Sequence, residues 1–343
     1  MMASRNLGAA IAACGLMIVL PGFLSPFWLT QIAIQSLCLG MVAASLSFLM
    51  RYSGQLSLAQ TSVAGVASYA LAYLGPNDVN LGPGWSMVAA VPAAFVISIL
   101  YSGAVGTLAA RTRGVNCLMI TLAIGMSVFY LARQNYSIFG GFRGISIGHP
   151  QLLGLAFNDG IPFYYLCLAI VIVSCVLVAY LEETPLGLAL RAVGSSPERT
   201  EADGYSVGVL KVVAAMLAGA LASCGGILLL WYHARISPGA IGVSSIIGTL
   251  IVAVLGGIQR PINAFLGAFL YVLLDNYAID LAGSERFQTL VGSIFLAVVV
   301  LSPNGVAGLL VWPRDGTKAL ARVKHCRCAA RKERIGGPSS IGQ

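Results

Sequence analysis

Hydrophobic residues occur in long runs along this chain, and short polar connections separate the runs. Most runs are close to the ~20 residues that a helix needs to cross the hydrocarbon core of a bilayer. The pattern predicts an all-α, polytopic membrane protein with about ten transmembrane helices. The expected spans are residues 6–24, 27–50, 55–74, 85–109, 115–132, 161–181, 210–232, 242–258, 262–282 and 287–310.

The composition excludes several classes of protein. Of the 343 residues, 58% are hydrophobic and 9% are charged, and the mean hydropathy is +0.86. Soluble domains carry about 25% charged residues. The excess apolar surface must therefore face lipid, which excludes a soluble enzyme, a nucleic-acid-binding domain and a disulfide scaffold.

Positive charge gathers at the C-terminal end and indicates the orientation. Residues 314–343 contribute +6 of the formal net charge of +8. We interpret residues 1–312 as the transmembrane domain and 313–343 as a basic, disordered, lipid-facing tail. With both termini in the cytoplasm, sixteen of the twenty Lys and Arg lie inside and four outside, as the positive-inside rule favours.

The polar connection at residues 182–209 carries two helix-start signals. Thr184-Pro185 suits the N-cap and first turn of a helix over 186–193, which we expect to break at Gly194. Ser196-Pro197-Glu198 repeats the signal and predicts a short helix over 197–203, with Gly204 as its stop.

Something must hold so short a helix in place, because an isolated helix of two turns is marginal in water. Its mixed charges, with Glu198, Arg199, Glu201 and Asp203, do not favour anionic lipid. A docking element for a soluble partner protein and a capped loop without a partner both stay open on spacing alone.

Several segments, in the same order along the chain, resemble the permease subunits of branched-chain amino-acid ABC importers. The resemblance covers about residues 30–312. The segments are Gly54–Gln60 with Gly65 and Tyr69, Gly140–Ile145, Gly187–Val193, Pro197–Arg199, Ala202–Val207 with Lys211, Ala214–Gly226, Ile236–Pro238, Leu255–Ile258 and Gly267-Ala268.

The resemblance implies a role for the short helix at 197–204, which would dock into a cleft on an ATP-binding subunit. Pro197 belongs to the matching motif, Gly204 would set the chain direction, and other residues would supply polar contacts. Those residues are Arg191, Glu198, Arg199 and Glu201.

The resemblance also implies partners and a location. The partners are two ATP-binding subunits, a second permease subunit that is more often a paralogue than a copy, and a periplasmic or extracellular solute-binding protein. The location is the bacterial plasma (inner) membrane. The sequence contains no Gly-x4-Gly-Lys-Ser/Thr phosphate loop, so ATP hydrolysis is expected on a separate chain, and we expect no enzyme activity, cofactor or metal site here.

The third expected span is unusually polar. Gln55, Ser57, Gln60 and Ser62 lie at membrane depth, where polar side chains face a neighbouring helix or a water-filled path. Lining of a translocation path and hydrogen bonding between helices are both open interpretations.

Two carboxylates near the end of the 262–282 segment bear on an alternative function. The alternative is a stand-alone secondary transporter or channel for a small polar solute, and a proton-coupled carrier of this kind would use a carboxylate near the membrane midplane. Asp275 and Asp280 lie toward the outer end of the segment, so we interpret them as acids at the membrane interface.

Overall fold

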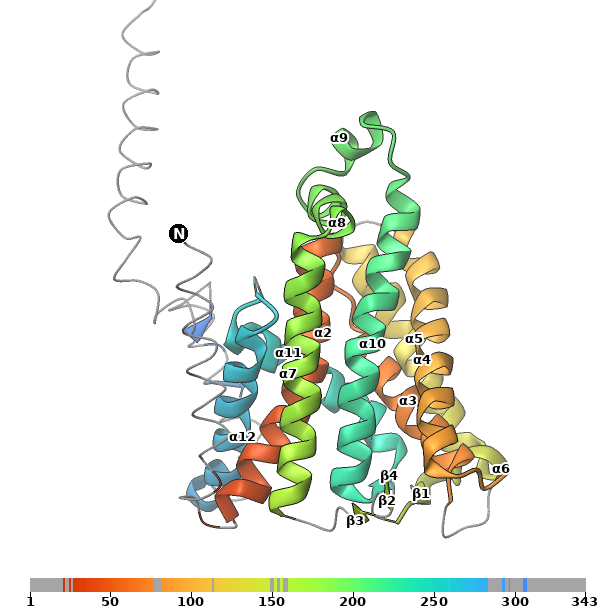
Figure 1. Ribbon diagram of the computed structural model, residues 1–343, viewed down its shortest axis with the longest axis vertical. Coiled ribbons are helices and arrows are strands. Elements are labelled where there is room, and N and C mark those ends of the chain that lie inside the picture. The colour runs from red at the N-terminus through yellow and green to blue at the C-terminus, as the bar shows by residue number, and fades with distance from the viewer. Residues whose placement is uncertain are drawn as a thin grey trace, which may run out of the picture.

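The structure is a computed structural model. It describes residues 27–76, 82–112, 114–148, 151–152, 155–156, 160–258 and 260–282, and a few isolated positions besides. The first and tenth expected spans, apart from such isolated positions, and the basic tail lie outside the described residues. In the described part, the chain forms a bundle of helices with two small strand pairs (Figure 1).

The helices coincide with eight of the expected spans. In chain order they are η2 (Trp28–Ile34), α2 (Gln35–Ser53), α3 (Gln60–Leu74), α4 (Met87–Ala110), α5 (Val115–Gln134), α6 (Tyr136–Phe139), η3 (Gly141–Arg143), α7 (Ile161–Glu183), α8 (Pro185–Ser195), α9 (Pro197–Ala202), α10 (Val207–His233), η4 (Pro238–Ile241), α11 (Val243–Gly256) and α12 (Asn263–Ala282). The strands are β1 (Ile145–Ser146), β2 (Gln151–Leu152), β3 (Leu155–Ala156) and β4 (Arg235–Ile236).

Five helices within the described residues are long and apolar enough to cross a membrane. They are the continuous η2–α2 helix, α4, α5, α7 and α10. Large apolar side chains point outward on several of them: Leu100, Met119 and Val173 are each more than 60% exposed. Outward-facing apolar side chains suit helices that contact lipid, and the expectation of a polytopic, all-α membrane protein is confirmed.

Two helices in the centre of the bundle are shorter than expected. The third expected span begins at residue 55, but α3 starts only at Gln60, because Gly54 ends α2 in the left-handed conformation (φ 64°) and an irregular segment follows. At 1.5 Å per residue, α3 rises about 22 Å and α11 about 21 Å, less than the ~30 Å hydrocarbon core. Neither helix by itself is long enough to cross that core.

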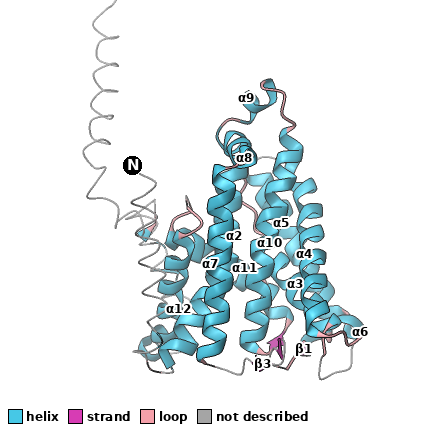
Figure 2. Ribbon diagram, viewed as in Figure 1, coloured by secondary structure: helices cyan, strands magenta, loops and turns pink. Residues whose placement is uncertain are grey.

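Helix α10 is the central helix and contacts α2, α3 and α4 closely (Figure 2). Small residues permit this approach, as in many membrane helix pairs. A Cβ at Gly226 would clash with the Ala64 carbonyl oxygen of α3. On the α4 side, the Ser98 and Ser223 hydroxyl oxygens lie 2.5 Å apart, so the two helices share a buried hydrogen bond.

The two ends of the bundle differ. Helices α8 and α9 project from one end, and the strands lie at the other end (Figure 1). At the strand end, β1 pairs with β4 in antiparallel fashion, with Ile145 opposite Ile236. Gly144 precedes β1 at φ 71°, and a Cβ there would clash with the Ile236 carbonyl oxygen. The pair thus joins two glycine- and proline-containing loops that are far apart in the sequence.

Candidate functional site

Helix α8 starts where the sequence predicts. The Thr184 hydroxyl accepts a hydrogen bond from the Gly187 amide at 3.3 Å, so Thr184 caps the helix. The expected break at Gly194 is wrong, because α8 continues to Ser195. Gly194 is instead a packing position: a Cβ there would lie 2.8 Å from the Arg51 carbonyl oxygen at the end of α2. Only glycine lets α8 approach the end of α2 this closely.

Helix α9 follows the prediction to within one residue. It begins at Pro197 and ends at Ala202, and Gly204 turns the chain with φ 87°. Thr200 is its buried residue, and its hydroxyl donates to the Ser196 carbonyl oxygen at 3.1 Å.

The charged side chains of α9 face outward. Glu198, Arg199 and Glu201 are all exposed, and within the described part of the chain none of them forms an ion pair. Helix α9 therefore presents three charged groups and no apolar face at the tip of the bundle.

Arg191 lies in a different environment from the α9 charges. Its guanidinium contacts the Glu182 carboxylate at 2.7 Å, and Arg51 contacts the same carboxylate at 3.3 Å. The Tyr52 hydroxyl donates to Glu182 at 2.5 Å, and both guanidinium groups lie 5.8 Å from the centre of the Tyr52 ring. We name these four residues the Glu182 cluster. It ties α8 to the ends of α2 and α7.

The four polar residues expected near a translocation path have partners within the protein or are buried. The Gln55 amide donates to the Ala109 carbonyl oxygen at 3.0 Å. The Ser57 hydroxyl accepts a hydrogen bond from the Ala59 amide at 3.4 Å. The Ser62 hydroxyl donates to a carbonyl one turn earlier and lies 3.2 Å from the Tyr101 hydroxyl of α4. Gln60 is 2% exposed, and its side-chain carbonyl oxygen has no hydrogen-bond partner within the described residues. These contacts favour the interpretation of hydrogen bonding between helices for Gln55 and Ser62.

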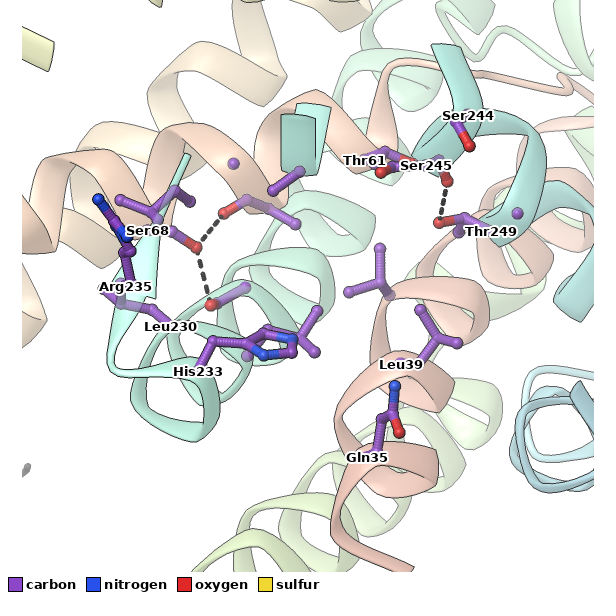
Figure 3. Close-up of a pocket in the computed structure, with 18 of the residues that line it drawn as sticks. Gln35, Leu39, Thr61, Ser68, Leu230, His233, Arg235, Ser244, Ser245 and Thr249 are labelled. Atoms are coloured by element: carbon purple, nitrogen blue, oxygen red, sulfur yellow. Dashed lines mark hydrogen bonds between the residues drawn. The ribbon is translucent and has the colours of Figure 1, made fainter. Parts of the chain in front are cut away.

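A cavity of about 310 Å³ lies on the other face of α3 (Figure 3). Thr61, Ala64, Gly65 and Ser68 line it from α3, with the i, i+3, i+4, i+7 spacing of one helix face. The other walls come from α2, α10, β4, the η4 region, α11 and α12. Their polar lining residues are Gln35, His233, Arg235, Ser244, Ser245, Thr249, Tyr271 and Asp275.

Helical periodicity is the sequence signal that distinguishes the two faces of α3. Thr61 and Ser68 are seven residues apart and face the cavity, whereas Gln60 and Ser62, one residue to either side of Thr61, do not line it. The Ser68 hydroxyl donates to the carbonyl oxygens of Ala64 and Gly226, at 2.9 and 2.8 Å (Figure 3). It thereby fixes α3 to α10 beside the cavity.

Charged groups enter the cavity wall from two sides. Arg235 and His233 come from β4 and the end of α10, at the strand end of the bundle. Asp275 comes from α12, which packs against α2 and α11. Asp275 thus lines the cavity, and its interpretation as an acid at the membrane interface stays a prediction. The side chain of Asp280 lies outside the described residues.

Comparisons with known proteins point to transport. The chain is 23% identical over 227 residues to the ribose import permease protein RbsC of Haemophilus influenzae, covering 62% of this chain and 68% of that protein. It is 26% identical over 200 residues to the probable branched-chain amino acid transport permease protein LivM of Methanocaldococcus jannaschii, covering 54% and 57%. The RbsC protein of Escherichia coli K12 is 25% identical over 233 residues, covering 63% and 68%.

No solved structure matches the chain significantly. The family model for the branched-chain amino acid transport system / permease component matches residues 28–301. This range includes every helix and strand described above, from η2 to α12. This match extends over most of the chain and includes α9, the Glu182 cluster and the cavity. The chain therefore belongs to the family of branched-chain amino acid transport system permease components, and it is a multi-pass transport subunit rather than an enzyme.

Proposed function

We propose that this chain is the permease subunit of an ATP-driven importer that carries branched-chain or related small amino acids or amides, delivered by an external binding protein. The observation that carries the proposal is the arrangement of the two ends: exposed charges on α9 at one end, and a polar cavity that reaches the strands at the other. The named relatives import ribose or transport branched-chain amino acids, and the latter substrate class agrees with the family.

In this proposal α9 receives the movement of an ATP-binding subunit. Glu198, Arg199 and Glu201 offer exposed polar contacts, and Pro197 and Gly204 set where the helix begins and ends. The subunit arrangement is two ATP-binding chains and a second permease chain, more often a paralogue than a copy. The α9 end then faces the cytoplasm of a bacterium, together with both termini, and the strand end faces the binding protein.

Movement of α9 reaches the cavity through contacts of the described residues. Helix α8 directly precedes α9 in the chain and is held to α2 and α7 by the Glu182 cluster. Helix α2 then runs the length of the bundle and lines the cavity with Gln35, Leu39 and Val42. A displacement of α8 therefore tilts a helix that forms one cavity wall, which is the movement that alternating access needs.

A charge reversal on α9 tests the proposal. We expect the double variant Glu198→Arg/Arg199→Glu to reduce the rate of ATP-dependent leucine uptake at least tenfold, because it inverts the charge pattern offered to the ATP-binding subunit. The same variant should lose co-purification of that subunit. Arg133→Glu, an exposed change near the strand end of α5 and far from α9, is the matched control for co-purification, which it should keep.

The alternative of a stand-alone secondary transporter has one observation in its favour, the Asp275 carboxylate in the cavity wall. The two functions differ in energy source. Vanadate should stop uptake by an ATP-driven importer. Uptake that survives ATP depletion but collapses with an uncoupler would establish the alternative.

A further inference from the structure

The charges of the cavity wall are balanced and separated. Asp275 contributes one negative charge from α12, and Arg235 contributes one positive charge from β4; His233 also lines the wall. Within the part of the chain that the structure describes, neither Asp275 nor Arg235 forms an ion pair. Asp275 is half-buried, and a carboxylate held partly away from water in an open cavity favours a cationic partner.

The rest of the cavity wall contains both polar and apolar side chains. Figure 3 shows Arg235, His233 and Ser68 on one side and Ser245 and Thr249 on the other. Apolar side chains also line the cavity, among them Leu39, Val42 and Leu229. The volume of about 310 Å³ is at the small end of the range for ligand pockets, so it suits a small solute.

We propose that this cavity is a binding site for the solute in transit, in which Arg235 pairs with the carboxylate and Asp275 with the ammonium group of a small aliphatic zwitterion. This inference rests on the proposed import function and goes further, because it assigns solute recognition to the permease itself. A zwitterion matches the two opposite charges of the cavity wall. A neutral sugar would leave both Arg235 and Asp275 without a charged partner. An anion or a cation would leave one of these two residues without a charged partner.

The apolar part of the wall accounts for the side chain of such a solute. Leu39 and Val42 of α2 and Leu229 of α10 face the cavity beside small residues of α3, and they offer a surface for a branched aliphatic group. Because α2 is also the helix tied to the Glu182 cluster, its tilt would move the apolar wall relative to Asp275. The site is therefore disrupted by the same movement that opens the path.

Equilibrium binding tests the inference. The importer complex containing the full chain is placed in nanodiscs without the external binding protein, and tritiated L-leucine is the probe. We expect saturable binding of leucine. Isoamylamine, which lacks the carboxylate, 4-methylpentanoate, which lacks the ammonium group, and D-ribose should each compete at least tenfold more weakly than unlabelled leucine.

Two substitutions test which residue binds the ammonium group of the solute and which binds its carboxylate. Asp275→Asn should weaken leucine binding about tenfold or more, the usual loss for a charge-assisted hydrogen bond, and leave the weak binding of 4-methylpentanoate unchanged. Arg235→Gln should weaken leucine and 4-methylpentanoate alike and leave isoamylamine unchanged. Arg133→Gln, an arginine of α5 that does not line the cavity, is the matched control and should bind leucine like the unaltered chain.

A residue swap guards against misfolding. The variant Asp275→Asn/Asn276→Asp keeps composition and net charge but moves the carboxylate one position along α12, to a residue that does not line the cavity. It should elute as a single species and still lose leucine binding. The inference is overturned if this variant or Asp275→Asn binds leucine normally, if leucine does not bind at all, or if D-ribose binds in preference. Intact ATP-dependent uptake in those cases leaves the import function standing, whereas absent uptake by the unaltered complex contradicts that function instead.

Discussion

At the scale of single residues, Glu182 makes contacts that sequence spacing could not indicate. Its carboxylate joins Arg51, Tyr52 and Arg191, which lie on α2 and α8. The sequence shows only an acid near a helix start. The partner Tyr52 is 130 residues away in the chain, so only folding brings the cluster together. We infer that Glu182 transmits movement between α8 and the bundle, whereas its neighbour Glu183 is exposed.

Substitutions of Glu182 and Glu183 test whether the two neighbouring acids have different roles. We expect Glu182→Gln to reduce ATP-dependent uptake several-fold and to destabilise the protein by about 1 kcal/mol, because two guanidinium groups lose a partly exposed carboxylate. Glu183→Gln should change neither. The measurements are leucine uptake and thermal unfolding of the purified protein, and equal effects of the two variants would contradict a special role for Glu182.

At the scale of elements, glycines determine how closely the central helices pack. Gly226 of α10 faces the backbone of α3 at Ala64, and Gly194 of α8 faces the end of α2. By contrast, Gly208 in the first turn of α10 has open space around its Cα. Gly226 and Gly208, both in α10, thus differ in whether a methyl group can be added at Cα without a clash. Their positions in the sequence alone do not indicate this difference.

Alanine substitutions test this difference. Gly226→Ala should destabilise the protein by about 1–3 kcal/mol, because the new methyl group pushes α3 away from α10. Gly208→Ala should be neutral or stabilising by up to about 1 kcal/mol, since alanine is the better helix former. Thermal unfolding in detergent measures both effects, and a loss of stability in Gly208→Ala as large as in Gly226→Ala would show that contact with α3 is not the cause.

At the scale of the whole molecule, the two ends of the bundle have separate tasks. The α9 end carries exposed charges, and the strand end carries the β1–β4 pair and the wall of the cavity. Our proposed orientation places these ends on opposite sides of the membrane, which agrees with the excess of positive residues on the α9 side.

Cysteine labelling tests the orientation. In a background without the eight native cysteines, we expect Glu201→Cys on α9 to react with a membrane-impermeant maleimide only in inverted vesicles. Phe142→Cys, at a position 71% exposed at the strand end, should react only in intact cells. Reaction of both cysteines from the same side would contradict a bundle that spans the membrane in this way.

Much of the architecture was evident from the sequence alone. Long apolar runs require lipid or burial, so the class of protein and the approximate positions of eight described helices follow from hydrophobicity. Local rules also placed the cap at Thr184 and the short helix that starts at Pro197, because proline and threonine act within one helical turn. The tertiary structure alone decided the length of α3, the continuation of α8 through Gly194, and the position of Asp275 in a cavity wall. These features depend on contacts between residues that are distant in the sequence, and such contacts exist only once the helices have packed.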